Sequence, residues 1–168
     1  MRYLVFFLSV FFGLGCSNTN NRKSTQMVET KSIIDTIRLT KLPAIGDFLG
    51  DSIRMTSNNR GQLVSSSDLS SSTTILNNGI IFEIAWDKDN RVNYIVTSDS
   101  NFITYENVKI NMTLKNIKDI QKVDIFEMPG WGYYIKLKSG WIAGFCIGKA
   151  CTDRELKNDD IVTSIFKR

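Results

Sequence analysis

The chain has 168 residues and a mass of 19.1 kDa, and 42% of its residues are hydrophobic, which is enough for one packed domain. It carries 21 Lys and Arg against 17 Asp and Glu. The resulting net charge of +4 is too small, and its basic residues too scattered, to indicate nucleic-acid binding. There are three Cys and no His. The missing histidine excludes Ser-His-Asp and Cys-His catalysis, His-ligated zinc and an imidazole proton shuttle.

Residues 1–15 have the composition of a targeting segment. Arg2 supplies a positive charge, and an apolar run follows from Tyr3 to Leu14, interrupted only by Ser9. This run is shorter than the roughly 20 residues that a helix needs to span a bilayer. It matches the apolar region of a secretory signal peptide. We therefore predict a signal peptide here, with a buried N-terminal helix as the alternative.

The segment ends in Gly13-Leu14-Gly15-Cys16. This resembles the lipobox of bacterial lipoproteins, in which a small residue precedes a cysteine that is lipidated and becomes the new N-terminus. The small residue is present as Gly15, whereas Gly13 and Leu14 depart from the usual pattern. The resemblance implies that Cys16 carries lipid and anchors the chain to a membrane of the bacterial cell envelope. Because Ser17 and not Asp follows, the family's sorting habit implies the outer rather than the inner membrane.

Residues 16–32 are polar after the cysteine and contain little that a core would bury. This composition is typical of a flexible tether, which would hold a domain roughly 20–25 Å from the lipid surface. Met27-Val28 leaves an ordered edge strand open as an alternative. We expect residues 33–168 to form a single β-rich domain.

Short apolar runs with period two and turn residues between them dominate that domain. They predict an α+β fold, an antiparallel twisted sheet of about six to eight strands with one short helix packed on it. The predicted strands are Ile33–Leu39, Ile53–Thr56, Gln62–Val64, Ile80–Trp86, Arg91–Thr97, Trp131–Lys138, Trp141–Ile147 and Asp160–Phe166. The serine-rich residues 65–79 are expected to be an exposed loop, with a polar edge strand or a saccharide-binding surface as alternatives.

Two of these strands form a predicted hairpin around Asp87-Lys88-Asp89-Asn90. The residues assigned to its core face are Ile80, Phe82, Ile84 and Trp86, with Val92, Tyr94 and Val96 over them. The loop resembles the opening of a calcium loop, but its sixth position is Val rather than Gly and its twelfth is Ser rather than Glu. We expect a solvated turn and no metal.

A helix is predicted from Leu114 to about Gln121, because Thr113 can cap it and apolar residues recur at helical spacing. The run from Val108 to Leu114 resembles the strand-turn-helix entry of small envelope lipoproteins. Asn111 stands where that family has Gly. The resemblance implies that a strand leads through a tight turn into a helix.

Cys146 and Cys151 remain if the first cysteine is lipidated. Placing Gly148-Lys149 at the centre of a two-residue type II′ hairpin turn puts the two cysteines opposite each other. Their Cα atoms would be about 4.5 Å apart, within the range for a disulfide. We predict a structural disulfide. Free thiols and a redox or metal pair are the alternatives. Four residues separate the two cysteines, which disfavours a redox pair because the C-x-x-C redox motif has only two residues between its cysteines.

The chain has no G-x-S-x-G elbow, S-x-x-K box or Rossmann fingerprint, so neither a catalytic motif nor a cofactor is predicted. Glu83 lies in an otherwise apolar strand and could pair with another carboxylate to serve a glycosidase; a paired or solvent-facing Glu83 is the alternative. The other carboxylates considered are Asp47, Asp51, Glu127 and Asp160. No two of them can be shown to converge from sequence.

Large aromatic side chains are concentrated in the C-terminal half. Trp131, Tyr133 and Trp141 are the candidate binding residues, because Gly130 and Gly132 can leave Trp131 at a loop. Alternation places Trp131 and Tyr133 on one face of their strand, and core packing is the alternative role.

Two functions remain open. The first is a non-catalytic, lipid-anchored module that binds a protein partner as an assembly factor, an inhibitor or an immunity-type protein. The second is a carboxylate-based hydrolase, or a binder, of envelope polysaccharide.

Overall fold

The computed structural model describes residues 37–51, 53, 60–63 and 69–168. They belong to a unit that spans Ile34–Arg168. The predicted signal peptide, Cys16, the tether and most of the predicted strand Ile53–Thr56 lie outside the described residues. Within the described part of the chain, no helix is both long and apolar enough to cross a membrane.

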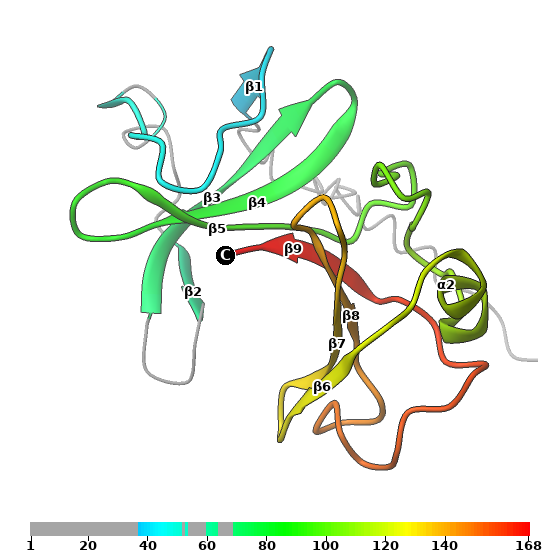
Figure 1. Cartoon of the computed structure of the whole chain (residues 1–168). Helices are drawn as coiled ribbons and strands as arrows, with labels where there is room; N and C mark the ends of the chain where they lie inside the picture. The colour runs from blue at the N-terminus through cyan, green and yellow to red at the C-terminus, as the bar shows by residue number, and fades with distance from the viewer. Residues whose placement is uncertain (1–36, 52, 54–59, 64–68) are drawn as a thin grey trace, which may run out of the picture. The chain divides into compact units, whose positions relative to one another are not determined.

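The described residues form one mixed sheet of nine strands (Figure 1). The strands are β1 (Ile37–Leu39), β2 (Arg60–Leu63), β3 (Leu69–Asn77), β4 (Ile80–Trp86), β5 (Val92–Thr97), β6 (Ile125–Met128), β7 (Gly132–Lys136), β8 (Ile142–Phe145) and β9 (Ser164–Lys167). Their order is β1-β3-β4-β5-β9-β8-β7-β6, with β2 also on β3. Every pairing is antiparallel except the parallel β1–β3 pair. The predicted α+β fold with a twisted sheet and a short helix is confirmed.

The serine-rich stretch is the main correction to the predicted elements. Residues 69–77 were expected to be a loop, but they form β3, which pairs with β4 on one edge and with β1 and β2 on the other. Ser72 is only 1% exposed. Asn78 and Gly79 both have positive φ, which makes the two-residue turn of a hairpin to β4. The stretch was misassigned because pairing on both edges, a tertiary effect, outweighs its weak strand propensity.

The predicted hairpin β4–β5 is present, with a register shift between Ala85 and Trp86. Beyond this bulge, Ile84 lies opposite Ile95, so Ile95 faces the core. Tyr94 and Val96, which were expected over that core, instead pack in a cluster on the other face of the sheet. The expectation was wrong because one extra residue in a strand reverses the side that each later side chain faces.

The predicted helix is confirmed as α2 (Leu114–Ile120). Thr113 caps it, since its hydroxyl accepts a hydrogen bond from the Asn116 N–H at 3.3 Å. The buried helix residues are Leu114 and Ile117. Asn111, in the turn before the helix, has φ +66°, a left-handed conformation that Gly adopts without strain and Asn adopts readily.

The C-terminal strands are shorter than predicted. The last strand begins at Ser164 rather than Asp160, because Asp160 binds Arg154 and Ile161 forms an isolated bridge with Thr113. Strand β6 was not predicted. It lies at the end of the sheet with three exposed residues, so it shows no alternation of buried and exposed positions.

Buried side chains form two clusters. The larger, which we call the main core, includes both buried residues of α2 and lies on the helix side of the sheet. The smaller contains Tyr134, Ile142 and Phe166, with half-buried residues around them. All of its members come from strands or from the turn between β6 and β7. We call this side of the sheet the second face; within the described ranges, no helical residue belongs to its cluster.

Candidate functional site

Four aromatic rings form a row across the second face: Tyr94 of β5, Phe166 of β9, Tyr134 of β7 and Phe126 of β6. Ring centroids are 5.5 Å apart from Tyr94 to Phe166, 5.5 Å from Phe166 to Tyr134 and 5.3 Å from Tyr134 to Phe126. These are ordinary distances for aromatic pairs, each of which adds about 0.5–1.5 kcal/mol beyond the area it buries. The row is thus a continuous packed unit.

The row crosses β8 above a glycine. Gly144 pairs with Tyr134 on one side and with Ser164 on the other. A Cβ atom built at Gly144 would lie 2.6 Å from the Ser164 hydroxyl oxygen and 3.4 Å from the Tyr134 ring. The missing side chain therefore lets the Tyr134 ring lie over β8 and reach Phe166. A glycine inside a strand pattern was the sequence signal for this close approach, and it was overlooked.

Exposure changes along the row. Tyr134 and Phe166 are buried, whereas Phe126 on the edge strand is 37% exposed. The pKa of Tyr94 is raised to about 12, chiefly by burial; the nearby Tyr134 and Glu83 contribute to the increase, and Arg168 opposes it. The Tyr94 hydroxyl is neutral at physiological pH with or without this shift, so it can donate a hydrogen bond. The row offers an apolar end at β6 and a polar end at β5.

Trp131 belongs to the second face. It lies in a turn in which its backbone N–H donates a hydrogen bond to the Met128 carbonyl at 2.9 Å. The Tyr134 hydroxyl donates a second hydrogen bond to the Trp131 carbonyl, also at 2.9 Å. The half-buried Trp131 ring packs against the aromatic cluster. Alternation had placed it beside Tyr133. That expectation was wrong because Gly132 has φ +136°, a conformation outside the strand region that interrupts the alternation.

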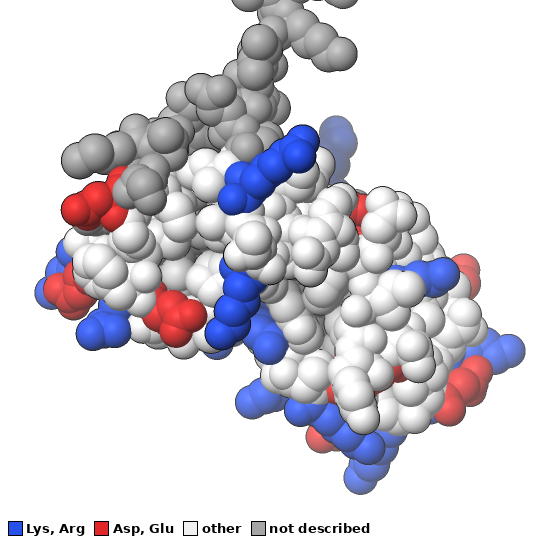
Figure 2. Space-filling model, turned by 90° about the horizontal axis from the view of Figure 1, so that it is seen from above, with Lys and Arg blue, Asp and Glu red and all other residues white. Residues whose placement is uncertain are grey.

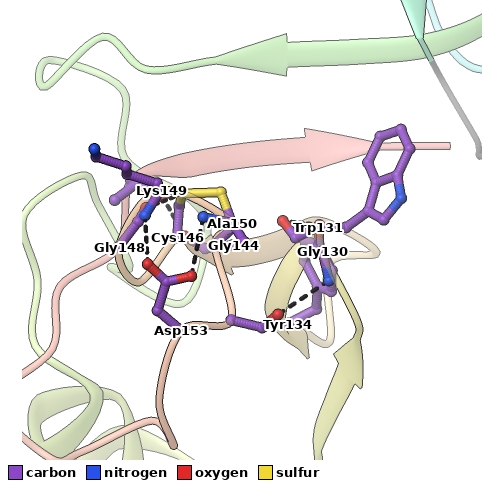
Figure 3. The surroundings of a disulfide bond; sticks show 12 residues. Gly130, Trp131, Tyr134, Gly144, Cys146, Gly148, Lys149, Ala150 and Asp153 are labelled. Atoms are coloured by element: carbon purple, nitrogen blue, oxygen red, sulfur yellow. Dashed lines mark hydrogen bonds between the residues drawn. A yellow bond between two sulfur atoms is a disulfide. The ribbon is translucent and has the colours of Figure 1, made fainter.

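The disulfide Cys146–Cys151 lies next to this turn (Figure 3). Gly148 has φ +74°, as predicted. The two-residue hairpin is not present. Instead the Ile147 N–H donates to the Cys151 carbonyl, and Ile147 forms a parallel bridge with Thr152, so the disulfide closes a wider loop.

A carboxylate fills the inside of this disulfide loop. Asp153 accepts hydrogen bonds from the backbone N–H groups of Lys149 at 2.7 Å and Ala150 at 3.1 Å (Figure 3). The Thr152 hydroxyl accepts from the Gly130 N–H at 3.0 Å. The disulfide loop therefore supports the turn that carries Trp131, and Figure 3 shows the Trp131 ring directed away from the disulfide.

The other two predicted binding residues lie in the main core. Tyr133 is buried, and its hydroxyl donates to the Arg154 carbonyl at 3.0 Å. Trp141 is buried with its ring 4.8 Å from that of Phe102, and the Lys167 ammonium lies 4.8 Å above the Trp141 ring. The structure therefore separates the three predicted aromatic residues, with one on the second face and two in the core.

A hollow of about 340 Å³ adjoins the polar end of the row. Its lining residues are Gln62, Thr74, Ile81, Glu83, Tyr94, Val96, Thr97 and Ser98. Glu83 is half-buried and accepts a hydrogen bond from the Ser72 hydroxyl at 2.8 Å. Its strand neighbours are Thr74 and Val96. We call this the Glu83 hollow.

Three of the other carboxylates considered from sequence have separate surroundings, and the fourth, Asp51, is exposed. Asp47 accepts from the Ala44 N–H, and Glu127 is exposed on β6. Asp160 forms two hydrogen bonds with the Arg154 guanidinium, which lower its pKa to about 2. Asp87 accepts from backbone N–H groups of its own turn, as expected of a solvated turn. Among the residues that the structure describes, no group of three or more Cys, Asp or Glu could hold a metal ion.

Charged side chains are unevenly placed on the face seen in Figure 2. Several Lys and Arg side chains lie across its middle, and mixed groups of basic and acidic side chains lie at its two ends. Comparisons with known proteins do not identify a relative: no family model, no curated protein and no solved structure matches the chain.

Proposed function

We propose that the chain is a lipid-anchored lipoprotein of the bacterial cell envelope, and that its β-rich domain binds a protein partner without catalysing a reaction. The observation that carries the binding role is the aromatic row with Trp131 on the second face. The row ends in exposed Phe126 on an edge strand, and apolar surface of this kind is typical of a protein interface. An assembly factor, an inhibitor and an immunity-type protein all act in this way.

The disulfide loop supports the same proposal. It holds the Trp131 turn through the Gly130–Thr152 hydrogen bond, so the turn enters an interface with little loss of conformational freedom. Rigid aromatic side chains are frequent among the residues that dominate binding energy. A small disulfide also suits an oxidising compartment outside the cytosol.

The test is co-purification from the native envelope with the tagged full chain, followed by mass spectrometry. We expect one protein to be recovered by the wild type and at least about tenfold less of it by Trp131→Ala, because losing a buried aromatic anchor costs roughly 2 kcal/mol. Tyr105→Ala is the matched control, since Tyr105 is 92% exposed and does not belong to the second-face cluster. Equal recovery with all three proteins would remove the second face from the interface.

The anchor has its own test. Cys16 should incorporate radiolabelled palmitate, and the lipidated chain should fractionate with the outer membrane. Three acyl chains at about 0.8 kcal/mol for each buried CH₂ make such an anchor effectively permanent. Cys16→Ser should abolish the label and release the chain from membranes. A labelled Cys16→Ser variant would contradict lipidation at this residue.

A hydrolase or a binder of envelope polysaccharide is the second candidate, and Glu83 in its hollow is the observation that favours it. A glycosidase requires a second carboxylate as partner and an acid with a raised pKa. The described carboxyl groups with a shifted pKa, Asp99, Glu106 and Asp160, are all shifted downward. Release of soluble sugars from envelope polysaccharide by the wild type, and its loss in Glu83→Gln, would establish the enzyme and overturn the proposed binder.

A further inference from the structure

We propose that the protein partner binds the outer edge of β6 by adding an extended strand antiparallel to it, with a basic side chain opposite Glu127 and an apolar side chain opposite Ile125. This inference rests on the proposed function and specifies how the partner reaches the second face. It assigns the backbone of β6 a role in recognition beside that of the aromatic rings.

The outer edge of β6 is open. β6 is the last strand in the sheet order and pairs with β7, whereas the outer edge of β3, near the other end of the sheet, is covered by β1 and β2. An edge strand presents unpaired backbone groups to another chain, and proteins often protect such edges with proline, bulges or a covering segment. β6 contains no proline, pairs with β7 without a register shift and, among the described strands, has no neighbour on its outer side.

The backbone of β7 shows which groups of β6 point outward. The Leu137 N–H donates to the carbonyl of Trp141, just before β8, at 2.8 Å. Backbone groups alternate in direction along a strand, so those of Ile135 and Tyr133, two and four residues earlier, also point toward β8. The N–H and carbonyl of Tyr134 therefore point toward β6.

This alternation leaves Ile125 and Glu127 facing outward. Tyr134 lies opposite Phe126, so the Phe126 N–H and carbonyl belong to the ladder with β7. The N–H and carbonyl groups of Ile125 and Glu127 then point away from β7. Within the described part of the chain, these groups form no hydrogen bond on that side. Donor and acceptor pairs that recur at every second residue are what an added antiparallel strand requires.

The side chains of β6 define the chemistry of the added strand. On the main-core side, Ile125 and Glu127 are both exposed, so an apolar and a basic side chain fit opposite them. On the second face, the partner residue between these two lies opposite Phe126, whose partly exposed ring contacts Tyr134. The added strand therefore extends the aromatic row beside the turn that carries Trp131.

The charges of this edge favour a different chain over a second copy. Asp124 and Glu127 are exposed and acidic, and Lys122 is the one basic residue between positions 122 and 128. Two antiparallel copies of β6 would bring the carboxylates of both edges together, which is unfavourable. A partner strand with a basic residue opposite Glu127 avoids this repulsion.

The first experiment is hydrogen exchange, measured by NMR, of the isotope-labelled full chain in detergent micelles without a partner. We expect the amides of Ile125 and Glu127 to exchange at least about tenfold faster than that of Phe126, because only the Phe126 N–H is hydrogen-bonded to β7. Equal or slower exchange at Ile125 and Glu127 would overturn the inference, since the edge would then be occupied by the N-terminal part of the chain or by a second copy.

The second experiment is an NMR titration of the same sample with the peptide acetyl-Thr-Lys-Val-Val-Thr-amide, whose three central residues fit opposite Glu127, Phe126 and Ile125. Two doubly N-methylated peptides are the matched controls. Methyl groups on the backbone nitrogens of Lys and the second Val remove the N–H donors that face β6, whereas methyl groups on the first Val and the last Thr remove donors that face solvent. We expect the first peptide to bind at least about tenfold more weakly than the second. Equal affinity of these two, or no binding of the unmodified peptide, would overturn the inference.

A charge reversal tests the position of the basic residue. The wild type should prefer the Lys peptide about threefold over the same peptide with Glu in place of Lys, because exposed ion pairs contribute little. Glu127→Lys should reverse this preference, which a merely unfolded variant could not do. Asp119→Lys, on an exposed position of α2, is the control and should keep the preference of the wild type. A preference for Lys that survives Glu127→Lys would contradict the pairing.

Failure of the inference is distinguishable from failure of the proposed function. If the inference alone is wrong, the partner is still captured from the envelope in a manner that depends on Trp131, and the two methylated peptides bind alike. If the proposed function is wrong, the dependence of capture on Trp131 is absent.

Discussion

The two faces of the sheet bury their side chains in different ways. On the main-core side, Ile84, Ile135 and Ile165 are completely inaccessible and lie in the same cluster as the buried side chains of α2. On the second face, Tyr134 and Phe166 are buried by neighbouring rings and half-buried residues of the same sheet. The first arrangement stabilises the domain, and the second preserves an ordered apolar surface with an accessible end.

The comparison shows that burial alone does not separate core from binding residues. Tyr133 and Tyr134 are adjacent and equally buried, yet one is a core residue and the other supports the candidate interface. They differ in the residues that cover them: Tyr133 belongs to the cluster that includes the helix residues, whereas Tyr134 is covered by residues of the strands and of the β6–β7 turn. Changes to the two faces should therefore affect stability and binding separately.

The largest expected effect is on the main core. Phe82→Ala should lower the free energy of unfolding by about 3–5 kcal/mol, because it removes a buried ring that contacts Phe102 and Trp141. Phe126→Ala on the second face should cost about 1 kcal/mol or less, because that ring is partly exposed. Urea unfolding of both variants measures the difference. Similar losses would mean that the two faces contribute alike to stability.

Gly144→Ala tests the support of the aromatic row. The added methyl group would overlap the Ser164 hydroxyl and press on the Tyr134 ring, at a cost of about 1–3 kcal/mol. Gly50→Ala is the control, since nothing lies within 4 Å of its Cβ position. We expect shifted ring signals for Tyr134 and Phe166 in NMR spectra and unchanged signals for the main core. Unchanged second-face signals would show that the row does not depend on Gly144.

Removing the disulfide should weaken the second face locally. The double variant Cys146→Ser/Cys151→Ser should lose about 2 kcal/mol, since closing so short a loop restricts the unfolded chain only slightly. Hydrogen exchange at Gly130 and Trp131 should increase, whereas exchange in α2 should not. Mass spectrometry of the oxidised protein should find no free thiol at either cysteine, and two free thiols would remove the disulfide from the account.

The smallest expected effect is that of the Arg154–Asp160 ion pair, which fixes the loop before β9. The folded-state pKa of Asp160, about 2, lies below the roughly 3.9 of an unfolded Asp. Its stabilisation is therefore complete above about pH 4 and is lost as the pH falls toward 2. Asp160→Asn should lower stability by about 1 kcal/mol or less at pH 7 and by almost nothing near pH 2. Thermal unfolding at both pH values measures this, and a pH-independent difference would contradict it.

Local patterns predicted the main-core side of the domain well. The alternation in Ile80–Trp86, the cap at Thr113 and the helical spacing after it depend on neighbouring residues alone, and each is confirmed. The fold class followed from the same patterns.

The second face was not predictable in this way, because it depends on events that sequence periodicity does not record. A bulge at Ala85/Trp86 moved Tyr94 to the other side of the sheet, and the backbone of Gly132 did the same for Trp131. The order β5-β9-β8-β7-β6 then brought together rings from distant parts of the chain. Cys16 and the tether stay predictions.

The most direct test of the proposed docking role is hydrogen–deuterium exchange of the full chain with and without the protein recovered from the envelope. The account predicts that the partner protects residues 125–134, while exchange in α2 is unchanged. Protection confined to α2, with none on β6 or β7, would contradict the account.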